Sequence, residues 1–196
     1  MDPMFAEGLG AGPDGVVRCA WALSPPDYLA YHDDEWGHRV HGEQALYERL
    51  TLESFQSGLS WLTILRKREH FRRAFHGFDP EVIAGFGEPD RDRLLADPGI
   101  VRNGAKIDAA IGNARAVVAL RNAGGLDALI WSFAPAGHTR PARLADAQTT
   151  SPESTALAKA LRAKGFRFVG PTTAYSVMQA CGLVDGHIAG CHRSPQ

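Results

Sequence analysis

The stretch from Leu52 to Trp61 combines one carboxylate with one large aromatic side chain. Glu53 and Trp61 stand on either side of a Gly-Leu-Ser turn, which ends one apolar helix and opens another. Glu53 lies at the end of an apolar stripe, where a buried carboxylate needs either a partner or a function. The alternative is an ordinary exposed glutamate on a helix, and this stretch alone does not decide between the two.

Tyrosine and tryptophan are concentrated in the first third of the chain, whereas most of the nine Phe come later. The group comprises Trp21, Tyr28, Tyr31, Trp36 and Trp61. Rings with polar edges suit a pocket that stacks a flat ligand, although burial in a core is the more usual fate of aromatic side chains.

Residues that could bind a metal lie near both ends of the chain. The four candidates are Cys19, His32, His187 and Cys191. Two Cys with two His suit tetrahedral zinc with no open position, which is a structural site, and the H-x3-C spacing lets one turn present the last two ligands. Eight His and three Cys also offer many chance pairs, and His192 is a rival ligand beside Cys191. Cys181 lies on an apolar helical face and is assigned to the core.

Residues 94–107 predict two helices joined by a tight loop. Gly99 and Gly104 permit sharp turns, and the second helix starts directly after Gly104. Its free N–H groups and its dipole can hold a phosphate, with Arg102 and Lys106 alongside. This arrangement is typical of a helix-hairpin-helix motif, which binds the DNA backbone without sequence specificity. Any turn between two helices that contains glycines would look similar.

Helices must position these groups, because the apolar spacing is helical along most of the chain. Helices are predicted from Glu43, from the N-cap Ser60, from Asp79-Pro80-Glu81 and from Pro89-Asp90, and over Ala105–Leu120, Leu126–Phe133, Pro152–Lys164 and Thr172–Leu183. An alternating strand pattern occurs only at Phe166–Val169. The predicted fold class is therefore all-α. Residues 1–17, rich in Gly and Pro, predict a flexible N-terminal extension before one domain over residues 18–196.

Composition limits the compartment and the partners. The chain has 196 residues, of which 44% are hydrophobic, enough for one sizeable core. No apolar run is long enough to span a membrane, the N-terminus does not resemble a secretory signal, and three Cys cannot form a disulfide framework, so we expect a reducing, cytoplasmic location. The net charge is −1, but residues 1–65 carry −7 and residues 66–196 carry +6, which allows a basic face. Charge alone favours an unevenly charged, solvated surface over a nucleic-acid site.

Taken together, these residues resemble the family of 3-methyladenine DNA glycosylase I over nearly all of residues 18–191. The similar motifs are Cys19-x-Trp21, Tyr28-x-x-Tyr31-His32-Asp33-x-Glu35-Trp36-Gly37, Leu52-Glu53-x-x-Gln56-x-Gly58-Leu59-Ser60-Trp61, Gly99-Ile100-x-Arg102, Ile111-Gly112-Asn113-Ala114-Arg115, Trp131-Ser132-Phe133, Gly165-Phe166-x-Phe168-Val169-Gly170 and Met178-Gln179-Ala180-Cys181-Gly182-Leu183. Their order and spacing are closely similar to those of the family, so the resemblance is specific.

The resemblance implies a helix-hairpin-helix glycosylase of base-excision repair, which hydrolyses the N-glycosidic bond of 3-methyladenine in double-stranded DNA and releases the free base. The positions that match the family's base pocket are Tyr28, Tyr31, Trp36, Glu53 and Trp61, with Glu53 as the catalytic residue. The wedge that fills the gap left by the flipped base matches Gly58 and Leu59, and the predicted contacts to the DNA backbone are Arg102, Gly104 and Lys106. The family's structural zinc, one Zn²⁺ per chain that joins the N- and C-terminal segments, matches Cys19, His32, His187 and Cys191. No Schiff-base lysine follows the hairpin, so no AP-lyase activity is expected, and we expect a monomer.

Methylation at N3 leaves the purine cationic, which explains why aromatic rings and one carboxylate would be enough to recognise it. Trp61 and Tyr31 are expected to sandwich the methylated purine, and Glu53 to accept hydrogen bonds from its exocyclic amine. Gly104 stands where a relative has a basic residue, so one phosphate contact is expected to be weaker. Two other classes stay open: a non-catalytic, zinc-containing helix-hairpin-helix module that binds duplex DNA but releases no base, and a zinc hydrolase, which would need an open metal position.

Overall fold

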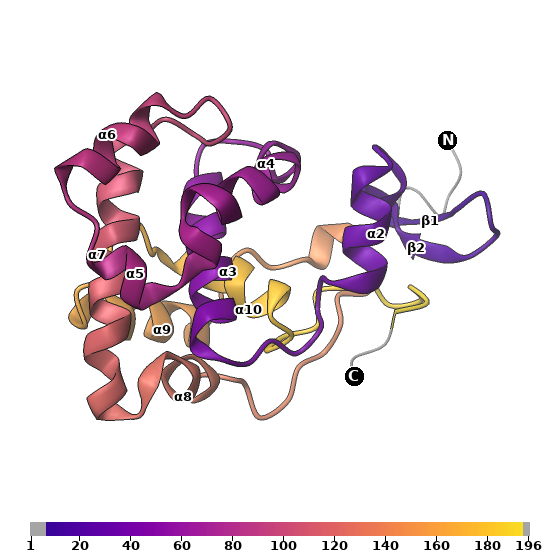
Figure 1. The fold of residues 1–196 in the computed structure, drawn as a ribbon. Helices are drawn as coiled ribbons and strands as arrows, with labels where there is room; N and C mark the ends of the chain where they lie inside the picture. Colours follow the sequence, from indigo (N-terminus) through magenta and orange to yellow (C-terminus); the bar gives the residue numbers. More distant parts are fainter. Residues whose placement is uncertain (1–6, 194–196) are drawn as a thin grey trace.

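The computed structural model describes residues 7–193, which are mostly helical, as the sequence predicts (Figure 1). The main elements are β1 (Leu9–Ala11), β2 (Val17–Cys19), α2 (Asp27–Asp34), α3 (Glu43–Gln56), α4 (Trp61–Ala74), α5 (Pro80–Ala84), α6 (Glu88–Ala96), α7 (Gly104–Leu120), α8 (Gly125–Trp131), α9 (Pro152–Ala163) and α10 (Pro171–Ala180). Short 3-10 helices lie at Ala20–Leu23, His76–Phe78, Arg121–Ala123 and Leu144–Asp146. None of the helices in this part of the chain has the length and apolar character needed to cross a membrane.

Local capping explains where several helices begin. The Ser60 hydroxyl accepts a hydrogen bond from the backbone N–H of Thr63 at the start of α4, as predicted. The Asp79 carboxylate caps α5 in the same way, and Asn103 caps α7. Such caps satisfy backbone donors that have no partner within the helix, and each typically contributes about 1 kcal/mol.

The core is built around α3 and α7. Helix α3 packs against α4, α7, α8 and α10, and α7 also packs against α5 and α6. Phe55 of α3 lies edge-on to Phe71 of α4, with ring centroids 4.8 Å apart, and both are fully buried. The Tyr47 hydroxyl donates to the carbonyl of Ala110 (2.9 Å), which ties α3 to α7. Helix α3, which carries Glu53, is therefore fixed on several sides.

The N-terminal segment differs from the flexible extension that its composition predicts. Strands β1 and β2 form an antiparallel hairpin in which Leu9 pairs with Cys19. Leu9 also packs against Cys19, Ile188 and Cys191, so the hairpin has an apolar anchor on the C-terminal segment. Residues 1–6 lie outside the described residues, and the domain boundary after residue 17 stays a prediction. Strands of three residues are too short to show an alternating pattern, which is why they were missed.

The only predicted strand, Phe166–Val169, is a loop between α9 and α10 in the structure. Phe166 and Val169 are buried there and the two residues between them are exposed, so burial does not alternate as it would in a strand. The β-hairpin of β1 and β2, helix α2 and the C-terminal segment lie on one side of the molecule, at the right of Figure 1. The other helices form the larger body beside them.

Candidate active site and metal cluster

A cavity of about 290 Å³ opens between the two parts of the molecule, and Glu53 lies in its wall. The lining residues are Trp21, Tyr28, Tyr31, Trp36, Glu53, Gln56, Trp61, Ser176 and Gln179. Three helices each contribute two residues spaced three apart, which places both on one face of the helix. Every predicted base-binding residue lines this cavity.

The Glu53 carboxylate is buried without a protein partner. Its residue is 6% exposed, and within residues 7–193 it accepts no hydrogen bond and forms no ion pair. Burial raises the pKa of Glu53 from 4.5 to about 8, and the charge of Arg49, one helical turn away, opposes this only in part. A buried carboxylate without a partner is unfavourable, so its place in a cavity wall suggests that a ligand supplies the missing interactions.

The two rings expected to sandwich a base are in contact with each other. The centroids of Tyr31 and Trp61 are 5.3 Å apart and the ring planes are tilted by 44°. This separation belongs to a directly contacting aromatic pair, so it leaves no space for a base between them. The expected sandwich is therefore wrong for this conformation, although both rings line the cavity. The indole N–H of Trp61 is buried without a hydrogen-bond partner among the described residues.

The other aromatic residues connect the cavity to its surroundings. The Tyr28 hydroxyl accepts a hydrogen bond from the backbone N–H of Leu62 (3.0 Å), which fixes the first turn of α4 against α2. Trp36 faces the cavity on one side and packs on His187 on the other, with centroids 4.6 Å apart. The cavity and the Cys/His cluster therefore share a wall.

The turn after α3 has the shape expected of a wedge. Gly58 has a φ of +82°, a conformation that glycine adopts without strain, and the side chain of Leu59 is 42% exposed. A second hollow lies beside the first and shares three of its residues. It is lined by Glu53, Gln56, Ser57, Gly58, Leu59, Thr172, Thr173 and Ser176. An apolar side chain therefore projects from the rim of the site.

The predicted hairpin is present, but Lys106 points away from solvent. Helices α6 and α7 are joined by residues 97–103, with Arg102 exposed and Gly104 at the first position of α7. The Lys106 ammonium is instead buried and donates to the carbonyls of Phe55 (2.9 Å) and Ser57 (2.5 Å). The expected contact between Lys106 and a phosphate is therefore wrong for its side chain, which fixes the end of α3 to the hairpin.

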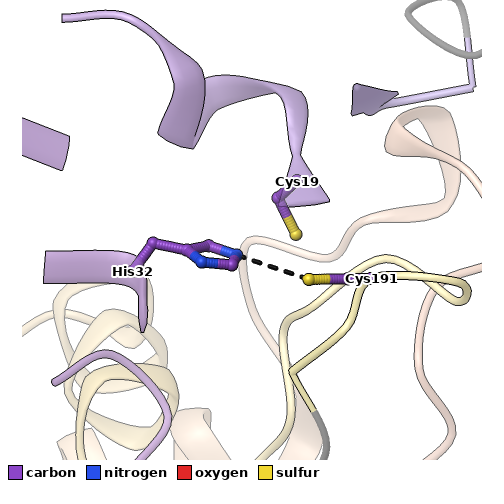
Figure 2. A group of neighbouring side chains, drawn as sticks. All are labelled: Cys19, His32 and Cys191. Carbon is purple, nitrogen blue, oxygen red and sulfur yellow. Dashed lines mark hydrogen bonds between the residues drawn. The ribbon is translucent and has the colours of Figure 1, made fainter. Parts of the chain in front are cut away.

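Three of the four predicted metal ligands meet between the chain ends (Figure 2). Cys19 comes from the end of β2, His32 from α2 and Cys191 from the C-terminal segment, and their ligand atoms all lie within 4.8 Å of one another. The His32 Nε2 is 3.5 Å from the Cys191 Sγ, while its Nδ1 bonds to Asp33 (2.7 Å). A hydrogen bond with the Cys19 thiol lowers the pKa of the Cys191 thiol well below its usual value. Such a cluster could hold a metal ion, because thiolate and neutral imidazole are metal ligands.

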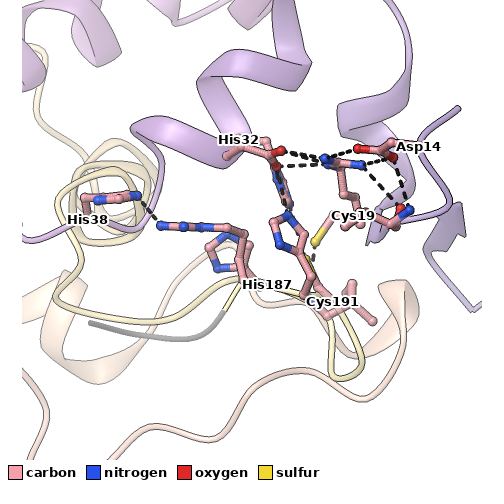
Figure 3. Close-up of polar contacts among 12 residues, drawn as sticks. Asp14, Cys19, His32, His38, His187 and Cys191 are labelled. Atoms are coloured by element: carbon pink, nitrogen blue, oxygen red, sulfur yellow. Dashed lines mark hydrogen bonds and ion pairs between the residues drawn. The ribbon is translucent and has the colours of Figure 1, made fainter. Parts of the chain in front are cut away.

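The fourth predicted ligand, His187, stands just outside this group (Figure 3). Its ring centroid is 5.0 Å from that of His32. Its Nδ1 bonds to Asp185 (2.6 Å), and its Nε2 is buried with no hydrogen-bond partner among residues 7–193. The rival ligand His192 bonds to Asp33 instead (3.1 Å). Cys181 is buried in the core, as predicted.

Sequence reasoning missed several residues of the site. Gln56, Ser176 and Gln179 line the cavity with polar groups, and Asp33 and Asp185 orient the two histidines. The signal for Gln56 was its place three residues after Glu53 on the same helix. Asp33 follows His32 directly, and Asp185 stands two residues before His187, so each carboxylate was within reach of a candidate ligand. Carboxylates often hold the other ring nitrogen of a metal-binding histidine.

The mostly helical fold, with a buried carboxylate in the wall of an aromatic cavity, belongs to the class of the 3-methyladenine DNA glycosylases. The chain belongs to the methyladenine glycosylase family, whose model matches residues 21–194. It is 46% identical over 181 residues to "DNA-3-methyladenine glycosylase 1" of Escherichia coli, an alignment that covers 90% of this chain and 96% of that protein.

Solved structures show the same fold. A crystal structure of 3-methyladenine DNA glycosylase I (TAG) is 48% identical in sequence, with a TM-score of 0.87, and the match covers 91% of this chain and all of the other. The structure that describes 3-methyladenine recognition by the enzyme from Staphylococcus aureus is 36% identical, with a TM-score of 0.86 over 91% of this chain and 97% of the other. The predicted family and fold class are thus confirmed.

Proposed function

We infer that this chain is a DNA-3-methyladenine glycosylase, which removes 3-methyladenine from DNA, and we propose Glu53 as its central catalytic residue. The observation that carries the assignment of Glu53 is its buried carboxylate, which lines the aromatic cavity and has no protein partner. The substrate is a purine made cationic by methylation at N3. Its bond to deoxyribose is already weak, so the protein must extrude the base, recognise its charge and stabilise the transition state.

Glu53 and the aromatic walls recognise charge together. A cation over an aromatic face gains roughly 0.5–2 kcal/mol, and the gain is larger in a dry site. The carboxylate adds an electrostatic attraction and accepts hydrogen bonds from the exocyclic amine of the base. A neutral adenine has the same amine but no positive charge, so it would gain the hydrogen bonds without the electrostatic attraction. The same buried carboxylate therefore supports both selectivity and stabilisation of positive charge on the sugar as the bond breaks.

Entry of the base requires Tyr31 and Trp61 to rearrange if it is to stack between them. Trp61 is only partly buried and stands at the first position of α4, so its side chain is the freer of the two. Tyr28 and Trp36 complete the aromatic walls, and Gln56 and Gln179 supply further polar groups. No lysine is among the residues that line the cavity, which supports hydrolysis without a Schiff-base lyase step.

The wedge and the hairpin act on the DNA itself. Leu59 would fill the gap in the duplex after the base leaves, with the turn at Gly58 giving close approach. Arg102 and the N-terminus of α7 at Gly104 would hold the backbone of double-stranded DNA, because the free N–H groups of a helix start bind phosphate.

Zinc is the metal that best suits the cluster. Cys19, His32, Cys191 and His187 supply two thiols and two imidazoles. Both histidines have Nδ1 bound to a carboxylate, which leaves Nε2 as the free ligand atom, and the unpartnered Nε2 of His187 fits a fourth bond. With four protein ligands, a zinc ion there would hold the two ends of the chain together and would have no position for substrate. Trp21 and Trp36 line the cavity beside Glu53 and pack on the histidines of the cluster.

Release of free base from alkylated duplex DNA is the test of this function. Wild-type protein should release 3-methyladenine in a single-turnover assay, and Glu53→Gln should release it far more slowly while binding the same duplex. The matched control is Glu48→Gln, on the same helix but outside the cavity, which should excise at the wild-type rate. A wild type that binds duplex DNA but releases no base would instead support a non-catalytic binding module.

A further inference from the structure

The loop between α9 and α10 holds an aromatic side chain out in solvent. Phe166 and Val169 are buried in the core, whereas Phe168 between them is 39% exposed. Phe168 has a φ of +56°, in the left-handed region that bulky side chains rarely adopt. Backbone strain of this kind costs about 1–3 kcal/mol and persists only where the surroundings impose it. The buried neighbours on both sides account for part of that constraint.

A buried amide supplies the rest of the constraint. Asn113 of α7 is 1% exposed, and its side chain uses both ends on the backbone of Arg167. Its Nδ2 donates to the Arg167 carbonyl (3.1 Å), and its Oδ1 accepts from the Arg167 N–H (2.8 Å). A satisfied pair of buried hydrogen bonds fixes a loop in one geometry. Arg167 and Phe168 are thus presented in a set direction.

This loop leads into the wedge side of the site. Three residues after Phe168 the chain enters α10, whose first-turn residues Thr172 and Thr173 line the hollow together with Leu59. Helix α7, which carries the amide clamp, begins at the hairpin. The loop is therefore connected directly to α10 and, through Asn113, to α7, which are two of the elements proposed to contact DNA. Few large apolar side chains are exposed in the described part of the chain, and Leu59 and Phe168 are two of them.

Arg167 is available for an anion. It lines an open groove with Arg91 and Arg115, and also with Glu88 and Asp108, of which Asp108 attracts Arg167 without forming an ion pair with it. Arg91 is held by Asp108 (2.6 Å), and Arg115 donates to backbone carbonyls. The Arg167 side chain, by contrast, is exposed and makes no hydrogen bond or ion pair with any residue from 7 to 193.

We propose that Arg167 and Phe168 form a second contact with duplex DNA beside the extruded nucleotide, with Arg167 on a backbone phosphate and Phe168 against a base or sugar face. The proposal rests on the proposed function, because it takes the same duplex as the occupant. An exposed aromatic ring next to a free guanidinium suits nucleic acid, in which apolar faces alternate with phosphates.

Binding to a duplex that carries a stable abasic-site analogue, measured at several salt concentrations, tests the two residues separately. Phe168→Ala should weaken binding about tenfold or more, the usual contribution of one aromatic stacking contact, with no change in salt slope. Arg167→Ala should weaken binding and reduce the slope of log Kd against log salt by about 0.9, the value for one phosphate. Val82→Ala, which removes a comparably exposed apolar side chain on α5, is the control and should bind like the wild type.

Phe168→Gly separates contact from folding, since glycine relieves the positive φ. It should bind DNA as weakly as Phe168→Ala, keep the wild-type affinity for free 3-methyladenine, and be no less stable to heat. The proposal is overturned if Arg167→Ala and Phe168→Ala both bind DNA and excise the base within twofold of an active wild type. A wild type that releases no base would contradict the proposed function, while weaker binding by the loop variants would still support this surface.

Discussion

The two buried polar regions of this protein are built on opposite principles. In the Cys/His cluster each histidine ring has its Nδ1 on a carboxylate, at 2.7 Å for His32 and 2.6 Å for His187. Burial acts against the charge of Asp33, yet hydrogen bonds from Arg18 and His32 hold its pKa well below the usual range. In the cavity, Glu53 is buried with no such partner, and its pKa rises.

The difference shows which groups serve the fold and which serve a ligand. In the cluster, a carboxylate fixes one nitrogen of each histidine, so the rings hold one conformation and the cluster can join the chain ends, while the Nε2 of His187 is left for a further bond. An unsatisfied carboxylate destabilises the folded state, and a protein keeps it where a ligand gains from it. The cavity should therefore respond to substitution through activity, and the cluster through stability.

Glu53→Gln is the strongest test of this contrast, and it should slow base excision by at least 100- to 1000-fold. Loss of one preorganised electrostatic group in a dry site typically has an effect of this size. Single-turnover kinetics on alkylated duplex DNA measure it. The same variant should keep its metal content and fold. A Glu53→Gln protein that is fully active would show that the cavity binds the base without using this charge.

Loss of the cluster should have the next largest effect, and it should fall on stability. Cys191→Ser and His187→Ala should each lower metal content and the melting temperature, because structural metal binding contributes several kcal/mol or more to folding. Chelation of the wild type should do the same. Elemental analysis and thermal unfolding measure both quantities. A His187→Ala protein with full metal content would exclude His187 as the fourth ligand.

Excision by the remaining folded fraction of these variants should stay within a few-fold of the wild type, because the cluster touches the cavity through the wall residues Trp21 and Trp36 and forms no hydrogen bond with Glu53 among residues 7–193. A large loss of rate in protein that is fully folded would mean that the two regions are not separable in the way their hydrogen bonding suggests.

A rise in pH should increase the rate of excision and decrease the stability of the folded protein. Excision measured as kcat/KM, which reports the free enzyme, should rise with pH through about 8 as Glu53 loses its proton. Stability should change the other way. The pKa of Glu53 is higher in the folded state than in the unfolded chain, so below about pH 4.5 its protonation costs nothing in either state. Between about pH 4.5 and 8 only the folded state holds the proton, and the free energy of unfolding falls by a few kcal/mol as pH rises.

Glutamine at position 53 does not titrate, so Glu53→Gln should remove the contribution of this residue to both pH dependences and should gain stability relative to the wild type as pH rises. Unfolding by denaturant at several pH values measures the second effect. A wild-type kcat/KM that is flat between pH 6.5 and 9 would mean that Glu53 is already ionised at neutral pH.

Local sequence signals predicted much of this fold. The caps at Ser60 and Asp79 and the helix from Pro152 act through residues two or three positions away, so the sequence contains both partners. The apolar stripe before Gln56 left burial of Glu53 as one of two interpretations, and in the structure the residue is buried. The absence of any partner for Glu53 depends on what other helices bring to the cavity, which no local pattern shows.

The other differences have the same origin. Three-residue strands are too short to be recognised by alternation, so the hairpin at the N-terminus was predicted as a flexible extension. The contact between Tyr31 and Trp61 depends on how α2 packs against α4. Lys106 stands beside a helix start, as a phosphate ligand would, but its direction is set by carbonyls that lie about fifty residues earlier in the chain.

Lys106→Met should have the smallest effect of these substitutions. It tests the contrast with Glu53, because Lys106 is a buried charge whose hydrogen bonds are satisfied by the protein. Burial lowers its pKa, but two carbonyls accept its hydrogen bonds, so by the argument above it serves the fold. Its loss would leave those carbonyls without a donor and should lower the free energy of unfolding by about 1–3 kcal/mol. Lys106→Arg, which keeps a cationic donor, should recover part of that loss. The salt dependence of DNA binding should not change in either variant, since the ammonium faces Phe55 and Ser57. If Lys106→Met instead reduced the slope of log Kd against log salt by about 0.9, Lys106 would contact a DNA phosphate and would not serve the fold alone.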